Sequence, residues 1–251
     1  MSCEVNINQF LESTYLKTPV QAGISAEETK RNVEELIIEA IKHKFKLVMI
    51  RPEFISMAKA MMAGANSYTE VGTVIGFHEG TYSTEDKLKE TEKAISDGVD
   101  ELDFVANYIA FKEGKVNLVK SEIFKCTKLA LDANKVAKWI IEISALTDEE
   151  IVGITQLIRD VVLDNFGEEK APKVYVKSST GFFKTEGGKP NGATFEGMQL
   201  IIENAKPLPA KAAGGVKNFK DALKMIEIGV KRIGTSAALA IADGNVNPDN
   251  Y

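Results

Sequence analysis

Two lysines beside short apolar runs are the residues of this sequence best suited to covalent chemistry. Lys177 ends one run and directly precedes Ser-Ser-Thr-Gly, and Lys211 lies in the next run, shortly before Gly214 and Gly215. On adjacent strands of one barrel, two cations would lower each other's pKa, and burial would lower it further. A lysine whose pKa falls to roughly 7–8 is a usable nucleophile at neutral pH. The alternative is a pair of independent surface lysines whose charged ends reach solvent.

Asp103 is the acidic residue best placed to act with these lysines. The alternation of polar and apolar residues puts Asp103 on the strand face opposite Leu102 and Phe104. A carboxylate on the inward face of a barrel strand requires a cation as a partner. Lys177 and Lys211 could supply that charge, and the alternative is a purely structural salt bridge.

Two glycine-containing loops predict a phosphate site. Gly214 and Gly215 follow the seventh apolar run, and Gly234, Thr235 and Ser236 follow the eighth. In α/β barrels, the loops after the last two strands often bind phosphate, together with the N-terminus of a short helix. Backbone N–H groups at glycine can approach phosphate oxygens closely, and a helix dipole from Ser236 onward would favour the dianion.

The composition allows a sizeable core and argues against several classes of protein. The chain has 251 residues, of which 44% are hydrophobic and 27% charged, with a net charge of −5. An isoelectric point near 5.3 argues against nucleic-acid binding through a broad basic face. Two cysteines, Cys3 and Cys126, cannot form a disulfide framework or a thiolate zinc site. With two histidines and no H-x-x-x-H spacing, we expect neither a metal nor another cofactor.

The hydropathy pattern predicts a cytoplasmic protein. No stretch reaches the ~18 uninterrupted apolar residues of a membrane helix. The segment 1–13 lacks the basic and apolar regions of a signal peptide. We therefore expect no membrane partner and no nucleic-acid partner.

Short apolar runs alternate with longer amphipathic ones along almost the whole chain. Several short runs are rich in Val and Ile, as is typical of parallel strands buried on both faces. The predicted strands are 10–12, 46–50, 71–76, 101–105, 139–143, 173–177, 210–213 and 232–234. The predicted helices with capping residues before them are 26–44, 85–98, 148–165 and 195–204.

About eight strand–helix units indicate an α/β fold, a single (β/α)8 TIM barrel. The alternative is a doubly wound open sheet, but no glycine-rich turn follows the first strand as that fold would require. No linker or low-complexity tract divides the chain. We therefore predict one catalytic domain over 1–251, in which 246–251 form a C-terminal tail.

Several motifs, in this order, resemble those of the deoxyribose-phosphate aldolase family. The resemblance runs from about residue 10 to the end of the chain. It is carried by Asp100-Glu101-Leu102-Asp103, Val176-Lys177-Ser178-Ser179-Thr180-Gly181 and Lys211-Ala212-Ala213-Gly214-Gly215-Val216, with Gly234-Thr235-Ser236 and Thr73-Val74-Ile75-Gly76-Phe77 in support.

The resemblance implies a metal-free class I aldolase of deoxyribonucleotide catabolism. Such an enzyme reversibly cleaves 2-deoxy-D-ribose 5-phosphate to acetaldehyde and D-glyceraldehyde 3-phosphate. By family analogy, Lys177 forms the Schiff base, Lys211 lowers the pKa of Lys177, and Asp103 joins Lys211 in a proton relay. The same analogy implies sugar phosphates and aldehydes as partners, and a homodimer as the assembly.

The resemblance also implies which residues bind the substrate and its phosphate. They are Glu12, Thr14, Thr180, Gly181, Gly214, Gly215, Gly234, Thr235 and Ser236. At Glu12 this chain departs from the family, whose members commonly carry Asp there. Met49 replaces a usual cysteine in the second strand. Tyr251 is last in the chain, and some members use a terminal tyrosine that folds over the site and assists proton transfer.

Two other functions stay open on these residues alone. A transaldolase-like enzyme would share the Lys177 chemistry but act on another, longer sugar phosphate. A non-catalytic barrel that binds a phosphorylated metabolite would keep the glycine loops without needing Lys177, Lys211 and Asp103 together.

Overall fold

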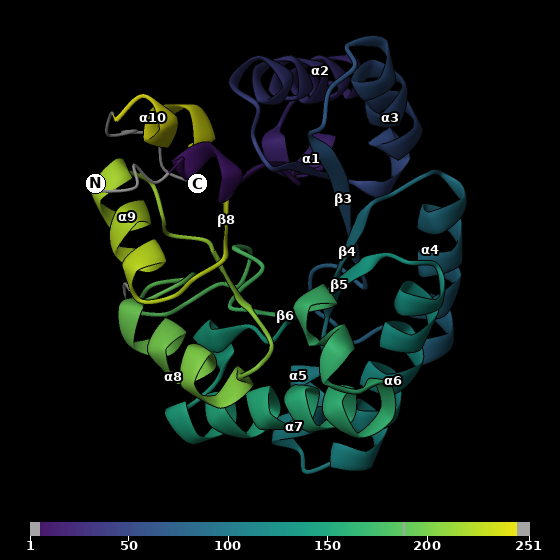
Figure 1. Ribbon diagram of the computed structural model, residues 1–251, viewed down its shortest axis with the longest axis vertical. Coiled ribbons are helices and arrows are strands. Elements are labelled where there is room, and N and C mark those ends of the chain that lie inside the picture. Colours follow the sequence, from purple (N-terminus) through teal and green to yellow (C-terminus); the bar gives the residue numbers. More distant parts are fainter. Residues whose placement is uncertain (1–5, 188, 245–251) are drawn as a thin grey trace.

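The computed structural model describes residues 6–187 and 189–244, and its centre is a closed barrel of eight parallel strands (Figure 1). Neighbouring strands pair in chain order, and the first strand closes the barrel against the last. The strands are β1 (Leu11–Tyr15), β2 (Leu47–Ile50), β3 (Glu70–Ile75), β4 (Glu101–Val105), β5 (Val136–Ile140), β6 (Val174–Lys177), β7 (Ala210–Ala213) and β8 (Arg232–Thr235). The predicted (β/α)8 barrel is therefore confirmed.

The helices lie around the outside of the barrel (Figure 1). They are α1 (Pro19–Ala22), α2 (Ala26–His43), α3 (Ile55–Gly64), α4 (Thr84–Ser96), α5 (Tyr108–Lys112), α6 (Val116–Asp132), α7 (Asp148–Phe166), α8 (Phe195–Ala205), α9 (Phe219–Glu227) and α10 (Ala238–Ala242). Short 3₁₀ helices occupy Ile7–Gln9, Pro52–Phe54, Ile143–Ala145 and Glu168–Lys173. No helix in the described part of the chain is both long enough and apolar enough to cross a membrane.

Side-chain caps fix where the four predicted helices begin. Ser25, Ser83, Thr147 and Thr194 each accept a hydrogen bond from a backbone N–H in the first turn of α2, α4, α7 and α8. Such bonds satisfy amides that the helix itself leaves unpaired, and each is worth about 1 kcal/mol. The predicted starts of these helices therefore agree with the structure to within one residue.

The fifth strand differs from its predicted position. It runs over Val136–Ile140 and not over 139–143, so that Trp139 lies inside it. The indole N–H of Trp139 donates to the Thr127 hydroxyl of α6 at 2.9 Å, and its ring stacks on Phe104. Because side chains alternate along a strand, Lys138 then points into the barrel. Lys138 interrupts the apolar pattern, so the pattern predicts a strand that begins three residues after the observed start at Val136.

The two faces of the barrel wall are packed with different side chains. Towards the helices the strands are apolar, whereas the interior holds charged residues with no solvent exposure, among them Glu12, Asp103, Lys138 and Lys211. Met49 is also fully buried, and a Cβ added to Gly72 would lie 2.7 Å from its Cε. Gly72 therefore leaves the space that this methionine fills.

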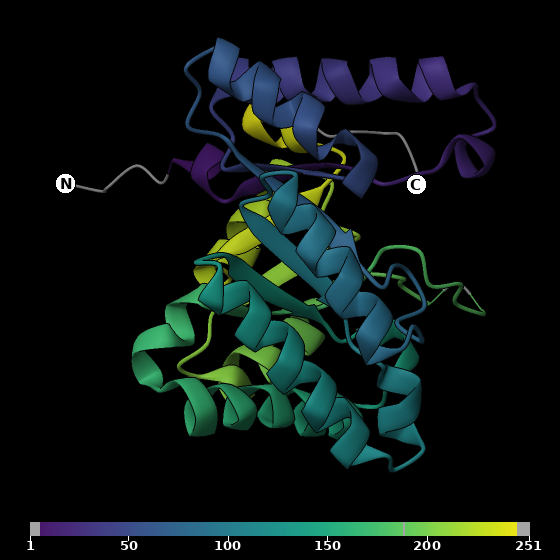
Figure 2. The ribbon, with the colours of Figure 1, turned by 90° about the vertical axis from the view of Figure 1, so that its right-hand side faces the viewer.

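The loops that follow the strands form the working end of the barrel. The loop between β6 and α8, drawn in green, projects beyond the body of the barrel (Figure 2). This loop contains Lys184 and Lys189, and its last residues fold back to the loop after β7. The strand ends and these loops position the site described next.

Candidate active site

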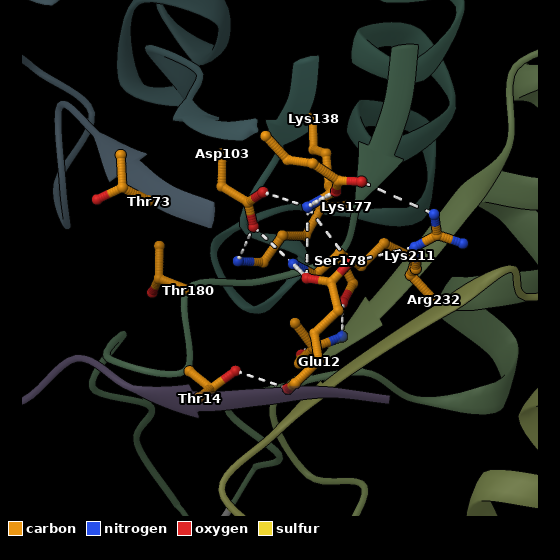
Figure 3. Close-up of polar contacts among 12 residues, drawn as sticks. Glu12, Thr14, Thr73, Asp103, Lys138, Lys177, Ser178, Thr180, Lys211 and Arg232 are labelled. Atoms are coloured by element: carbon orange, nitrogen blue, oxygen red, sulfur yellow. Dashed lines mark hydrogen bonds and ion pairs between the residues drawn. The ribbon is translucent and has the colours of Figure 1, made fainter. Parts of the chain in front are cut away.

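Asp103 lies at the centre of a cluster of three lysines (Figure 3). Its Oδ2 accepts hydrogen bonds from Nζ of Lys177 at 2.8 Å and from Nζ of Lys211 at 2.7 Å. Its Oδ1 accepts from Nζ of Lys138 at 3.0 Å. One carboxylate of β4 thus bridges side chains from β5, β6 and β7. The structure brings together the three residues that the sequence singled out and adds a fourth.

Backbone and hydroxyl contacts hold the two predicted lysines side by side. Lys177 and Lys211 are direct partners in the register of β6 and β7. The amide of Ser178 donates to the carbonyl of Lys211 at 3.1 Å. The Ser178 hydroxyl also bridges to the backbone of Ala213, accepting from its N–H at 3.0 Å. These contacts fix the ends of both strands, and with them the relative position of the two amines.

Burial and ion pairing act against each other on these groups. Burial alone would raise the pKa of Asp103, but Lys138, Lys177 and Lys211 outweigh it and hold the pKa far below its usual range. For Lys211, burial has the larger effect, and Lys138 and Lys177 add to it, so its pKa falls to about 8. Asp103 is therefore a permanent anion, whereas Lys211 can exchange a proton near neutral pH.

Glu12 belongs to this cluster and not to a substrate pocket. Its side chain is fully buried inside the barrel, where Oε2 accepts a hydrogen bond from Nζ of Lys211. Its Oε1 lies 3.2 Å from Nζ of Lys138 and 3.6 Å from Nε of Arg232. Glu12 is not among the residues that line the pocket described next, and its contact with substrate stays a prediction. Thr14, two residues later, does reach the pocket.

A pocket opens above the cluster at the carboxyl ends of the strands. Lys177 is the residue that both lines this pocket and contacts Asp103. The pocket is also lined by predicted binding residues, namely Thr14, Thr180, Gly181, Gly214, Gly215, Gly234, Thr235 and Ser236. The structure thus gathers them around one amine.

Glycine is required where two loops of the pocket meet. Gly214 has a φ of +76°, and a Cβ added to it would lie 2.9 Å from Cα of Gly192. The amide of Ala193 donates to the carbonyls of Ala213 and Gly214 at 3.1 and 3.0 Å. The loop before α8 therefore packs directly on the loop after β7. A side chain at Gly214 would separate the two.

Two predicted hydroxyls are already used within the protein. The amide and hydroxyl of Thr180 both donate to Oε2 of Glu142, and the Thr235 hydroxyl donates to the carbonyl of Val216 at 2.8 Å. Both residues shape the pocket while their hydroxyl protons point elsewhere. The predicted helix from Ser236 also begins later, at Ala238, and has five residues. Ser236, by contrast, is exposed and lines the pocket.

Comparison with known proteins identifies the family. No family model matches the chain. A deoxyribose-phosphate aldolase from Thermococcus gammatolerans is 36% identical over 222 residues, covering 88% of this chain and 92% of that protein. Another, from Lactococcus lactis, is 36% identical over 248 residues, covering 98% of this chain and 100% of that protein. This chain belongs to the deoxyribose-phosphate aldolase family.

Solved structures agree with this assignment. The aldolase QR15 superposes with a TM-score of 0.79 at 29% identity, covering 95% of each chain. A deoxyribose phosphate aldolase from Aeropyrum pernix, described as tetrameric, gives a TM-score of 0.73 at 26% identity and covers 94% of this chain and 89% of that one. The predicted family, fold and enzyme class, a carbon–carbon lyase, are confirmed.

Sequence reasoning missed three charged residues of this aldolase. Lys138 lies outside the predicted strand 139–143, so the prediction did not place it in the barrel interior. Glu142 follows β5 with a φ of +57° and holds Thr180, and nothing in the sequence linked the two. Lys217 lines the pocket directly after the Gly214 loop, and its position in that motif was a usable signal.

The remaining sequence features are the C-terminal tail, Cys126 and the possibility of a metal site. Tyr251 and the tail 246–251 lie outside the described residues. Cys126 is buried, and burial raises the pKa of its thiol to about 12, which makes it unreactive. Within 6–187 and 189–244, no group of three or more His, Cys, Asp and Glu side chains could hold a metal ion. The absence of a cofactor stays a prediction.

A substitution at Gly234 tests how tightly Lys211 is packed. A Cβ added there would lie 3.2 Å from Cε of Lys211 and 3.7 Å from its Nζ. We expect Gly234→Ala to displace the amine and to lower kcat about ten- to a hundredfold, measured as the rate of aldol cleavage. Gly64→Ala is the control, because its added Cβ meets nothing within 4 Å. Full activity in Gly234→Ala would contradict the expectation.

Proposed function

We propose that this aldolase reversibly cleaves 2-deoxy-D-ribose 5-phosphate to acetaldehyde and D-glyceraldehyde 3-phosphate through a Schiff base on Lys177. The observation that carries the proposal is the position of the Lys177 amine. Residue Lys177 is 3% exposed and lines the pocket, and its amine shares Oδ2 of Asp103 with the amine of Lys211. An amine so placed can meet a carbonyl on one side and a proton-exchanging partner on the other.

The chemistry follows from the order of bonds made and broken. The neutral amine of Lys177 attacks C1 of the open-chain sugar, and loss of water gives an iminium. The C2–C3 bond then breaks, its electron pair moves into the iminium, and the C3 hydroxyl loses its proton as it becomes an aldehyde. The enamine that is left takes up a proton at C2 and is hydrolysed to release acetaldehyde and the amine.

Lys211 is the group proposed to carry the proton between these steps. Its pKa of about 8 allows it to accept and return a proton near neutral pH. Asp103 stays ionised throughout, because its pKa lies far below the usual range. In the proposed relay, Asp103 therefore acts as the anion that orients both amines, and a water molecule completes the path to the substrate.

The glycine loops are proposed to hold the phosphate. Gly214, Gly215 and Gly234 line the pocket together with Ser236 and the cationic Lys217, and backbone N–H groups at such glycines can approach a phosphate closely. The phosphate does not react, so its binding energy can be used to place C1 beside Lys177. This division of the pocket separates recognition from bond cleavage.

Removal of the phosphate from the substrate should therefore affect the rate strongly. We expect kcat/KM for 2-deoxy-D-ribose to be about 10²-fold or more below that for its 5-phosphate. In Lys217→Met the value for the 5-phosphate should fall, while the value for the unphosphorylated sugar should stay the same. Steady-state rates of acetaldehyde release measure both. An equal loss on the two sugars would contradict a phosphate role for Lys217.

A borohydride trap tests the proposed function directly. Acetaldehyde and borohydride are added to the intact protein, and the modified peptide is identified by mass spectrometry. An ethyl adduct on Lys177 supports the proposal, whereas an adduct on Lys211 would exchange the roles of the two lysines. An adduct formed only with a longer sugar phosphate would favour a transaldolase-like enzyme. No adduct with any carbonyl compound would overturn the Schiff-base mechanism.

The proposal extends to the setting in which the enzyme works. Breakdown of deoxyribonucleotides in the cytoplasm supplies such a sugar phosphate, and no other class of partner is proposed. A homodimer stays the predicted assembly of this chain. Sedimentation of the purified protein would distinguish it from the tetramer described for the Aeropyrum pernix relative.

A further inference from the structure

Lys138 is the lysine of the buried cluster that the proposed reaction does not use. It is fully buried, and its Nζ lies 2.5 Å from Oε2 of Glu101, 3.0 Å from Oδ1 of Asp103 and 3.2 Å from Oε1 of Glu12. We propose that Lys138 is a positioning residue that shares the carboxylates of Asp103 and Glu12 with Lys211 and thereby weakens their attraction for the Lys211 amine. The inference rests on the proposed function and adds a residue to it.

The geometry places Lys138 and Lys211 on the same two carboxylates. Asp103 gives Oδ1 to Lys138 and Oδ2 to Lys211. Glu12 likewise lies near Lys138 through both oxygens, and its Oε2 also accepts from Lys211. Each carboxylate is therefore shared by Lys138 and Lys211, and Asp103 also contacts Lys177. Figure 3 shows Lys138 and Lys211 approaching this pair from different strands.

Sharing a carboxylate weakens its pull on either cation. Without Lys138, the negative charge of Asp103 and Glu12 would act more strongly on Lys211 and would bind its proton more tightly. Lys138 also repels a second positive charge directly, which again favours neutral Lys211. Both effects act in the same direction. The positive charge of Lys138 thus helps Lys211 to release and take up a proton.

Glu142, directly after β5, acts on Lys177. The other charged or titratable groups that face this cluster lie on the described strands. They are Glu12 on β1, Glu70 on β3, Glu101 and Asp103 on β4, Tyr175 and Lys177 on β6, Lys211 on β7 and Arg232 on β8.

Lys138 itself does not exchange its proton. Its three carboxylate neighbours outweigh burial and raise its pKa well above the usual value. Burial and the charge of Glu101 raise the pKa of Glu70 to about 7, and that group lies at the opposite end of the barrel. Glu70 meets the cluster through Glu101. The contacts that join Glu70 to Lys211 run through Glu101, Lys138 and a carboxylate that Lys138 and Lys211 share.

Glu12 connects this arrangement to the first strand. Its carboxylate pairs with Lys211 and lies 3.2 Å from Nζ of Lys138 and 3.6 Å from Nε of Arg232. Lys138 is thus held by β1 as well as by its neighbour β4, across the width of the barrel.

The pH dependence of Lys138→Met tests the inference. Acetaldehyde trapping on Lys177 and steady-state cleavage are followed from pH 5 to pH 10, and the midpoint assigned to Lys211 is compared between proteins. Methionine keeps the length of the side chain and removes its charge. We expect the midpoint to rise by about one pH unit. kcat at pH 7 should fall about tenfold while KM stays nearly the same, because Lys138 does not line the pocket.

Lys138→Arg should leave the midpoint near the wild-type value, since it restores the charge. Lys87→Met is the matched control. Lys87 is fully buried and lies 2.7 Å from Oε2 of Glu122, between α4 and α6, where it contacts none of the site lysines. We expect it to lower thermal stability without moving the midpoint.

A double variant keeps the inference testable if Lys138→Met does not fold. Lys138→Met with Glu101→Gln removes one positive and one negative charge together, and Glu101 is not a contact of Lys211. The midpoint should still rise in this double variant. An unshifted midpoint in folded Lys138→Met or in the double variant would overturn the inference, as would an equal shift in Lys87→Met. Failure of the wild-type protein to form any adduct would instead overturn the proposed function itself.

Discussion

Lys177→Met is expected to form no borohydride-trapped adduct and to lose about 10⁴-fold or more in kcat. Methionine fills nearly the same space as lysine, so the loss follows from the missing amine and not from a cavity. The iminium on Lys177 is the proposed acceptor for the electron pair of the breaking C–C bond. Without it the carbanion would have no stabilising group within reach. Peptide mass spectrometry and the rate of acetaldehyde release measure the two effects.

The matched control for this prediction is Lys173→Met. Lys173 directly precedes β6, at the opposite end of the strand, and its side chain is partly exposed and donates to Asn134. It should trap acetaldehyde as the wild type does. If Lys177→Met kept its activity while Lys211→Met lost the adduct, the nucleophile would be Lys211 and the proposed roles would be reversed.

Asp103→Asn is expected to reduce both stability and activity. The change keeps the shape of the side chain but leaves Lys138, Lys177 and Lys211 without their common anion in a buried site. Breaking a buried ion pair on one side costs about 3–5 kcal/mol of unfolding free energy. kcat should fall by about 10³-fold, because both amines lose the group that orients them. Urea unfolding and steady-state kinetics measure the two losses.

The stability difference should also depend on pH. The folded pKa of Asp103 lies below the unfolded value, so its ionised form stabilises the folded protein at every pH above about 4. As the pH falls below that value, the unfolded chain takes up a proton that the folded protein resists, and the contribution declines. The unfolding free energies of wild type and Asp103→Asn should therefore approach each other in acid.

Asp100→Asn is the control for Asp103→Asn. Asp100 lies just before β4, is partly exposed, and pairs with Lys59 at 2.8 Å away from the site lysines. It should change kcat little. Equal stability of Asp103→Asn and wild type at neutral pH would show that the three lysines do not depend on this carboxylate.

Local patterns of the sequence were sufficient for the barrel and most of its parts. Helix caps such as Ser83 and Thr147 act within one turn, so short-range sequence reveals them. The βα order then fixes which strands are neighbours, and Lys177 and Lys211 become adjacent for that reason alone. Asp103 could be assigned to the interior from the alternation along its own strand.

Strand limits were less well determined where a charge lies within the barrel. β1 extends to Tyr15, whereas the prediction ends at residue 12, because the polar Ser13 and Thr14 interrupt the apolar pattern. β5 begins at Val136, whereas the prediction begins at residue 139, because Lys138 interrupts the pattern in the same way. Burial of a charge is favourable only when a partner is present, and local sequence does not show the partner.

The sequence by itself determined the barrel order, the motif lysines and the glycine loops, since each depends on neighbours in the chain or on the order of strands. Tertiary structure alone decided the place of Lys138 and Glu12. Lys138 lies 126 positions from Glu12 in the chain, and Lys211 lies 199 positions from it. These side chains meet because the barrel closes and its interior excludes water, so that each buried charge must find an opposite one. The pairing of these charges therefore depends on the closed barrel, and a short segment of the sequence does not reveal it.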